Sequence, residues 1–298
     1  MKKPKRLTIE QFRERFPDDD ACLGFLFKKN YGNLLNCPKC GREPNFKRVK
    51  NRRAYQCSTC AFHIYPTAGT VWHQSTIPLS YHFYACYLFT TTRNGVAAKE
   101  LERQLNICYK TALRMAHQIK RLMGNRETKK LLGEIVMDEK FLGGSFYNMH
   151  QSKRNERMSY NSSENKTAVF GMMDKEGKSI ITKIMAPEKI KGKFLKPIIR
   201  ENVDSNSTVV TDGFGGYSNL HKEFSSHEII NHLKGEYARN GFSTNRIENY
   251  WSTLSRMIRG THIHVSSRHL SKYVDENSFR YVNRGQPEKM LDLILENV

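Results

Sequence analysis

The sequence predicts a protein of the mixed α/β or α+β class, with a small metal-binding module and a helical segment ahead of a larger domain. Two Cys-x-x-Cys pairs lie within the first 60 residues. Apolar residues at helical spacing dominate residues 76–124. From residue 133 onward, apolar and β-branched runs precede and then alternate with helical patterns, which is typical of a mixed sheet layered with helices.

The chain is strongly basic. Its 298 residues contain 49 Lys and Arg against 29 Asp and Glu, a formal net charge of +20. Such a charge indicates a polyanionic partner, either nucleic acid or an anionic membrane. The longest largely apolar stretch, 81–89, is too short to cross a bilayer, and the N-terminal MKKPKRLTIEQF lacks the apolar segment of a secretory signal. We therefore expect a DNA-binding protein without membrane association, in a reducing compartment where disulfides are rare.

Four of the seven cysteines predict a zinc ribbon. Cys37-Pro38-Lys39-Cys40 and Cys57-Ser58-Thr59-Cys60 are separated by 16 residues. Each Cys-x-x-Cys turn directs two thiolates to one centre, and two such turns complete a tetrahedron around Zn²⁺. Gly41 suits the tight turn after the first pair. The predicted ligands of this structural zinc are Cys37, Cys40, Cys57 and Cys60, and a redox-active dithiol is the lesser alternative.

Residues 1–73 are expected to form a first domain, in which two short helices precede the ribbon. Apolar spacing predicts an amphipathic helix over 8–16 and another over about 21–29, although Gly24 weakens the second pattern. The three cysteines outside the ribbon pattern have apolar neighbours and are expected to be packed thiols. They are Cys22, Cys86 and Cys108.

Residues 76–124 predict a helix-turn-helix. Pro78 begins an aromatic-rich helix, and after Asn94-Gly95 two helices over 96–105 and 109–123 flank a three-residue turn. A second helix with a polar and basic face can enter the major groove of DNA, although an ordinary helical hairpin has the same pattern. The candidate DNA-binding residues on this face are Lys110, Arg114 and Arg121, with Thr111 and Gln118 beside them.

Residues 133–284 predict a mixed sheet with helices, after a basic linker over 125–132. The sequence DKEG at 174–177 is a hairpin signal, and the polar stretch 143–164 is expected to be a mobile loop. The predicted strands are 134–141, 167–173, 179–185, 207–211 and 227–231. The predicted helices are 191–201, 217–224 and 245–258.

Three carboxylates in this domain are candidates for a metal site. Asp138 and Asp212 lie on predicted strands, and Glu248 lies at the start of an amphipathic helix. Two strand-borne aspartates and a helix-borne glutamate can converge on two Mg²⁺ ions, which prefer oxygen ligands and promote in-line phosphoryl transfer. Each carboxylate also has a structural interpretation: Asp138 as a strand end facing water, Asp212-Gly213 as a turn, and Asn245 with Glu248 as a capping box.

Several short motifs lie in register over residues 8–284. They are Arg15-Phe16-Pro17, Cys37-Pro38-Lys39-Cys40-Gly41, Thr67-Ala68-Gly69-Thr70, Ile77-Pro78-Leu79, Lys99-Glu100-Leu101, Thr111-Ala112, Asp138-Glu139, Gly143-Gly144, Thr211-Asp212-Gly213, Thr244-Asn245, Ile247-Glu248, Trp251-Ser252, Arg259-Gly260-Thr261 and the run HVSSRHLSKYVDENSFRYVNR at 264–284. In these motifs the chain resembles bacterial insertion-sequence transposases with a zinc ribbon and a DDE domain, which are related to the eukaryotic Merlin transposons.

The resemblance implies a ribonuclease H-like catalytic fold whose triad falls on Asp138, Asp212 and Glu248. Some branches of the family have Asn as the third member, which makes Asn245 or Asn249 a further candidate. Three positions depart from the family pattern: Ser255 replaces a usual Lys and is followed by Arg256, Ser243 replaces a common His, and Leu113 replaces a usual Trp.

We interpret the chain as a DNA transposase with structural zinc and catalytic Mg²⁺, which Mn²⁺ can replace. It would bind the terminal inverted repeats of its element, nick each end, and join the freed 3′-hydroxyl to target DNA. A basic edge that includes Arg256 and Arg259 would contact the phosphate backbone. Joining two ends implies a homodimer or a larger assembly, and residues 285–298 are expected to be a C-terminal tail.

Two alternatives remain at this stage. A domesticated, catalytically impaired DNA-binding regulator is favoured slightly by Ser255, whereas the intact triad argues against it. A nuclease that cleaves without strand transfer is the other. The expected location is cytoplasmic and nucleoid-associated in a bacterium, or nuclear in a eukaryote.

Overall fold

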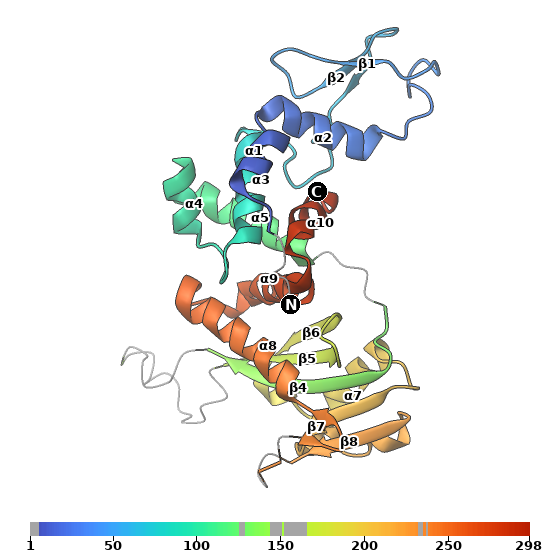
Figure 1. The fold of residues 1–298 in the computed structure, drawn as a ribbon, viewed down its shortest axis with the longest axis vertical. Coiled ribbons are helices and arrows are strands. Elements are labelled where there is room, and N and C mark those ends of the chain that lie inside the picture. Colours follow the sequence, from blue (N-terminus) through green and yellow to red (C-terminus); the bar gives the residue numbers. More distant parts are fainter. Residues whose placement is uncertain (1–5, 125–128, 144–150, 152–165, 232–234, 237) are drawn as a thin grey trace. The chain divides into compact units, whose positions relative to one another are not determined.

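The computed structural model describes residues 6–124, 129–143, 151, 166–231, 235–236 and 238–298. The chain divides into two compact units, Met1–Met123 with Gln286–Val298, and Gly124–Gly285 (Figure 1). Most of the polar loop predicted over 143–164 lies outside the described residues, as do the first four residues of the predicted linker. No helix within the described ranges is both long and apolar enough to cross a bilayer.

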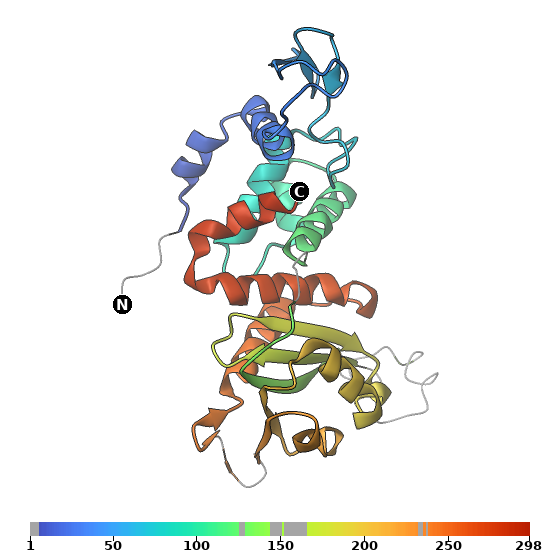
Figure 2. The same cartoon turned by 90° about the vertical axis from the view of Figure 1, so that its right-hand side faces the viewer.

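The first unit is built mainly from short helices. They are α1 (Ile9–Arg15), α2 (Asp19–Tyr31), α3 (Leu79–Thr91), α4 (Ala98–Leu105), α5 (Tyr109–Gly124) and α10 (Met290–Glu296). Thr8 and Gln11 form a capping box at the start of α1, and the Asp18 side chain caps α2. Residues 285–298 are more than a tail, because α10 packs against α3 (Figure 2).

The core of the first unit is aromatic. Phe12 of α1, Phe83 of α3 and Trp72 are buried, and Phe16 stacks edge-on against Phe83 with ring centroids 4.7 Å apart. Beside these helices lies a small antiparallel sheet of β1 (Phe46–Arg48), β2 (Tyr55–Cys57) and β3 (His63–Ile64). The helices supply the apolar surface that a ribbon of this size cannot bury alone.

The second unit is organised around a five-stranded sheet in the order β6-β5-β4-β7-β8. Its strands are β4 (Glu134–Leu142), β5 (Thr167–Asp174), β6 (Ile180–Met185), β7 (Thr208–Asp212) and β8 (Ser226–Ile230). The first three pair antiparallel, whereas β7 lies parallel to both β4 and β8. Gly177 has φ +66° in the turn between β5 and β6, which confirms the predicted hairpin. This mixed sheet agrees with the expected ribonuclease H-like fold.

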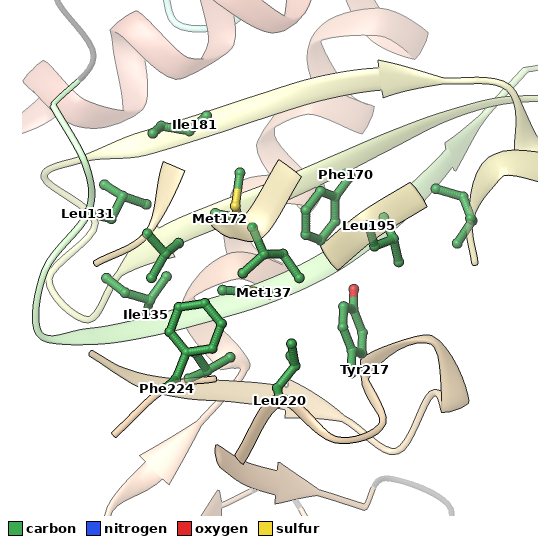
Figure 3. Packing of buried hydrophobic residues seen from close by; sticks show 14 of the residues in the cluster. Leu131, Ile135, Met137, Phe170, Met172, Ile181, Leu195, Tyr217, Leu220 and Phe224 are labelled. Carbon is green, nitrogen blue, oxygen red and sulfur yellow. The ribbon is translucent and has the colours of Figure 1, made fainter. Parts of the chain in front are cut away.

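Helices cover both faces of the sheet. On one face α7 (Gly192–Asn202) packs over a cluster that includes Phe170, Leu195 and Tyr217 (Figure 3). On the other face α8 (Asn245–Arg256) and α9 (Leu270–Val282) pack over a second cluster. Successive strand residues point to opposite faces, so Met137 belongs to the α7 cluster and Val136 to the α8 cluster.

Some elements of this unit differ from the sequence prediction. The helix expected over 217–224 is two 3₁₀ turns, Gly215–Tyr217 and Leu220–Lys222, because Asn219 between them has φ +62°. A small hairpin of β9 (Ala238–Arg239) and β10 (Phe242–Ser243) precedes α8. The chain continues beyond α8 as a π-helix, Met257–His262. Further 3₁₀ turns are Pro187–Lys189, Ser267–His269, Asn283–Gly285 and Pro287–Lys289.

Candidate active site and zinc centre

The four ribbon cysteines form one tetrad, with their sulfur atoms all within 4.8 Å of one another. The two Cys-x-x-Cys turns have the same backbone hydrogen bonds. The Cys37 N–H donates to the carbonyl of Arg42, and the Cys57 N–H donates to that of Phe62, both at 2.8 Å. Gly41 and Ala61 close the two turns in left-handed conformation, with φ of +68° and +61°. The role predicted for Gly41 is confirmed.

The backbone of each turn favours the thiolate form. The backbone N–H of Cys40 is the main cause of a lowered pKa at Cys37, and the N–H of Cys60 is the main cause at Cys57, whose pKa falls to about 6. Thiolates are the form that binds zinc, and four of them at this spacing fit a closed structural site.

The other three cysteines do not share one environment. Cys22 and Cys86 are buried, as predicted for packed thiols. Cys108 is exposed, so the same prediction is wrong for it. It lies in the turn before α5, where its sulfur is 3.2 Å from the Thr111 hydroxyl instead of packing into the core.

The predicted helix-turn-helix corresponds to α4 and α5, joined through Asn106 in left-handed conformation with φ +49°. Lys110, Arg114 and Arg121 are all exposed on α5. Gln118 does not join them, because its side chain donates to the carbonyl of Val71 at 2.6 Å. The exposed face of α5 is therefore basic, as a helix that contacts DNA requires.

Asp138 and Asp212 lie side by side on neighbouring strands, at the same level of the sheet. Val136 of β4 is paired with Val210 of β7 in parallel register, and each aspartate lies two residues further along its strand. Both valines belong to the cluster under α8, so the alternation of strand side chains turns both aspartates toward α8. Glu248 is in the first turn of that helix.

Asp138 is held by two donors. Its Oδ1 accepts from the backbone N–H of Glu139 at 2.8 Å, and its Oδ2 accepts from Trp251 Nε1 at 2.9 Å. Burial raises the pKa of Asp138 and the negative charges of Asp212 and Glu248 act in the same direction, so that this pKa is about 6. The three carboxylates therefore lie within electrostatic reach of one another. Among the described residues only the cysteine tetrad brings three potential ligands within 4.8 Å, so the carboxylates are more widely spaced.

Trp251 has a role that its place in an apolar helical stripe does not reveal. Gly171 lies opposite Asp138 in the β4–β5 register. A Cβ added at Gly171 would lie 2.9 Å from the Trp251 ring. The glycine thus leaves room for the indole, whose N–H reaches Asp138. In the sequence, a Gly within a strand and a Trp in the helix that packs on it are the features that point to this close contact.

Glu248 is not part of the predicted capping box. The N-cap of α8 is Thr244, whose side chain makes no capping bond, and Asn245 is the first helical residue. Instead the buried Thr244 hydroxyl donates to Glu248 Oε1 at 2.7 Å. Because Asn245 has already entered the helix, it cannot cap it. Asn245 and Asn249 are both exposed.

The predicted basic edge follows Glu248 along the same helix and its π-helical continuation. Arg256 and Arg259 are exposed, and Ser255 is half-buried. Position 255 is seven residues beyond Glu248, close to two full turns, so it falls on the same face of α8.

A second carboxylate, also half-buried, lies beside Asp138 on the opposite face of the sheet. Glu139 Oε2 accepts a hydrogen bond from the Tyr217 hydroxyl. The pKa of Glu139 is raised to about 7, mainly by burial. The hydrogen bond from Tyr217 lowers this pKa, whereas the charges of Asp138 and Asp212 raise it. Tyr217 follows Asp212 in the chain, so the Glu139–Tyr217 pair connects β4 beside Asp138 with the turn that follows Asp212.

Comparisons with known proteins agree with this arrangement. The ISXO2-like transposase domain matches residues 130–282, just over half of the chain. A transposase zinc-ribbon domain matches residues 17–63. An "Uncharacterized transposase-like protein" of Haemophilus influenzae is 35% identical over 89 residues, which cover 30% of this chain and 71% of that relative. The chain therefore belongs to the ISXO2-like transposases, and it carries their DDE domain behind a transposase zinc ribbon.

Proposed function

We propose that the protein binds the terminal inverted repeats of its element and catalyses metal-dependent DNA cleavage and strand transfer. The zinc ribbon and α5 would recognise the repeat, and the sheet domain would nick each end and join the freed 3′-hydroxyl to target DNA. Because two ends must be joined in one event, the active complex would be a homodimer or a larger assembly.

The observation that carries this proposal is the placement of Asp138, midway along β4, beside Asp212, at the end of the parallel strand β7, under the helix that bears Glu248. An all-oxygen ligand set suits Mg²⁺ or Mn²⁺. Two ions held by the three carboxylates would activate the attacking oxygen and stabilise the leaving one. Trp251 and the Glu139 N–H would hold Asp138 in its binding orientation.

The cationic surface supports the DNA-binding part of the proposal. Lys110, Arg114 and Arg121 are exposed on α5, where they can contact the repeat. Arg256 and Arg259 are exposed beyond Glu248, where they can contact the phosphate backbone beside the carboxylates. DNA affinity is thereby assigned to the basic side chains and DNA cleavage to the carboxylates, and mutation can test the two separately.

The test replaces Asp212 by Asn and Glu248 by Gln in the full chain, with Glu201→Gln as control because Glu201 is an exposed carboxylate of α7 outside the site. Without added Mg²⁺ and without a chelator, which would remove the structural zinc, all variants should bind repeat DNA like the parent. With Mg²⁺, cleavage by D212N and E248Q should fall by orders of magnitude while E201Q matches the parent. Parental cleavage by D212N would overturn the proposal, and parental activity of E248Q alone would move the third ligand to Asn245 or Asn249.

The regulator alternative rests on Ser255, which stands on the Glu248 face where related transposases usually have Lys. If the parent binds the repeat but neither cleaves nor joins it with Mg²⁺ or Mn²⁺, the protein is a DNA-binding regulator. Ser255→Lys should then add DNA affinity without cleavage. If the parent cleaves but transfers no strand to target DNA, the protein acts as a nuclease.

A further inference from the structure

The start of α7 and the loop after Asp212 enclose a hollow of about 450 Å³. Its charged lining consists of Lys193, Lys196 and Arg200, and Ser218 adds a hydroxyl. No acidic side chain lines it among the described residues. The hollow lies on the α7 face of the sheet and is separate from the basic residues of α5 and α8 considered above.

The three cations share one face of α7, at positions i, i+3 and i+7. Like charges at such spacings destabilise a helix unless an anion offsets them. Glu223 offsets part of this positive charge, because it forms a bidentate pair with Arg200 at 2.6 and 2.9 Å. Lys196 also lowers the pKa of Glu223, after Arg200. Three cations facing one carboxylate leave the hollow with a positive charge.

The backbone adds to this potential. Gly192, which also lines the hollow, is the first residue of α7, and the N-cap Lys191 makes no side-chain capping bond. A Cβ at Gly192 would lie 2.9 Å from the carbonyl oxygen of Gly216, so the glycine lets the positive end of the helix approach the loop. Convergent cations and a helix start together favour a phosphate group.

Two exposed aromatic residues are chain neighbours of residues that line the hollow, although they are not part of its lining. Phe194 follows Lys193 and Phe214 precedes Gly215, and each is 37% exposed. Exposed aromatic rings beside cations are a common feature of surfaces that contact nucleic acid. The Phe214 N–H donates to Asp212 Oδ1 at 3.0 Å, which links this segment directly to the candidate active site.

The hollow lies close to Asp212 in the chain. Five residues lie between Asp212 and Ser218, and six extended residues span at most about 20 Å. Along a duplex this distance corresponds to about six base pairs. A duplex that passes the edge of the sheet beside Asp212 would therefore bring a phosphate within reach of the hollow.

We propose that this hollow is a phosphate-binding subsite for the DNA backbone, within about six base pairs of the scissile phosphate. Lys193 and Lys196 contact the phosphates. Arg200, held in place by Glu223, completes the charged lining of the site. The assignment rests on the proposed function and extends it to a surface on the opposite face of the sheet from Glu248.

The first test measures how the affinity for a duplex carrying the element end depends on KCl concentration, without added Mg²⁺ and without a chelator. The variant K193Q/K196Q should lower the log–log slope by about 2, since each phosphate contact contributes about 0.9. The control K189Q/K222Q removes the same charge from exposed lysines that do not line the hollow, and its slope should fall by less than 1. K193R/K196R should keep the parental slope. Equal losses in the first two variants would overturn the proposal.

The second test is ethylation interference on the same duplex. Within about six base pairs of the cleavage site, some ethylated phosphates should weaken binding by the parent but not by K193Q/K196Q, whereas those contacted by Arg256 and Arg259 should weaken binding by both proteins. Interference that is identical in both proteins would overturn the subsite. If the parent does not cleave DNA but the slope of K193Q/K196Q still falls by about 2, the proposed cleavage activity is contradicted and the phosphate subsite is supported.

If the parent cleaves DNA and K193Q/K196Q keeps the parental slope, only the phosphate subsite is contradicted.

Discussion

The indole N–H of Trp251 donates to Asp138 Oδ2 at 2.9 Å, so a side chain of α8 orients a carboxylate of β4. Trp251 is only 3% exposed, and its ring lies against Gly171 on the neighbouring strand. A partner that orients a metal-binding group affects metal affinity without touching the metal. In this protein the same residue belongs to the core and to the candidate active site.

Replacing Trp251 by Phe should therefore keep most of the packing and lose the hydrogen bond. We expect cleavage at limiting Mg²⁺ to fall by about 10–100-fold, because Asp138 is no longer fixed. The measurement is a titration of cleavage against Mg²⁺ concentration, with DNA binding without added Mg²⁺ as a check on folding. Tyr250→Phe is the matched control, since the Tyr250 hydroxyl contacts Ser278 and not Asp138. A parental Mg²⁺ dependence in W251F would contradict the prediction.

Glu139 should make stability depend on pH. Its pKa in the folded protein is about 7, above the ordinary value of 4.5. The folded state therefore binds the proton more tightly than the unfolded chain, so stability is highest below about pH 4.5 and declines as the pH rises toward 7. Glu139→Gln removes the charge while its amide oxygen still accepts from Tyr217. At pH 8 we expect a gain of about 2 kcal/mol in unfolding free energy.

The gain should be measured as the melting temperature at pH 4 and at pH 8. About 4–8 °C is expected at pH 8, and no gain at pH 4. Glu176→Gln is the control, because a hydrogen bond from exposed Lys178 lowers the pKa of Glu176, and removing that carboxylate should give no gain. An equal gain for E139Q at both pH values would show that burial of the charge is not the cause.

The fold class and the placement of the two aspartates were predictable because each depends on a local period. Alternation along β4 and β7 fixes which face Asp138 and Asp212 share, and a 3.6-residue period fixes the buried side of α8. The Trp251–Asp138 bond was not predictable, since it depends on how closely α8 approaches β5 at Gly171. The capping box failed for a similar reason: Thr244 and Asn245 both suit an N-cap, and only tertiary packing that buries Thr244 selects between them.

Base recognition by α5 can be separated from phosphate contact. Replacing Arg114 by Gln should weaken binding to the inverted repeat more than to random DNA, because a lost base contact costs about 1–3 kcal/mol only on the cognate sequence. Lys110→Gln and Arg121→Gln, made in parallel, report on the exposed positions at either side. Equal losses on both DNAs, with a reduced salt slope, would make Arg114 a phosphate contact.

The zinc ribbon offers a test in which the two turns serve as controls for each other. The purified, reduced protein should contain about one zinc per chain. Because metal binding and folding of such a site are coupled, changes in turn stability should alter the zinc affinity. Ala61 holds a left-handed conformation that is unfavourable for any residue with a Cβ, whereas Gly41 occupies the equivalent place without this cost.

Ala61→Gly should therefore tighten zinc binding, by about twofold after the extra entropy of glycine in the unfolded chain is included. Gly41→Ala should weaken it by a similar factor. The exchange variant, with both substitutions, should return close to the parent, because the turns have equivalent backbone hydrogen bonds. Competition with a chromophoric chelator measures all three affinities. If Ala61→Gly weakens zinc binding as much as Gly41→Ala does, the alanine methyl group makes a contact in the ribbon that outweighs its backbone strain.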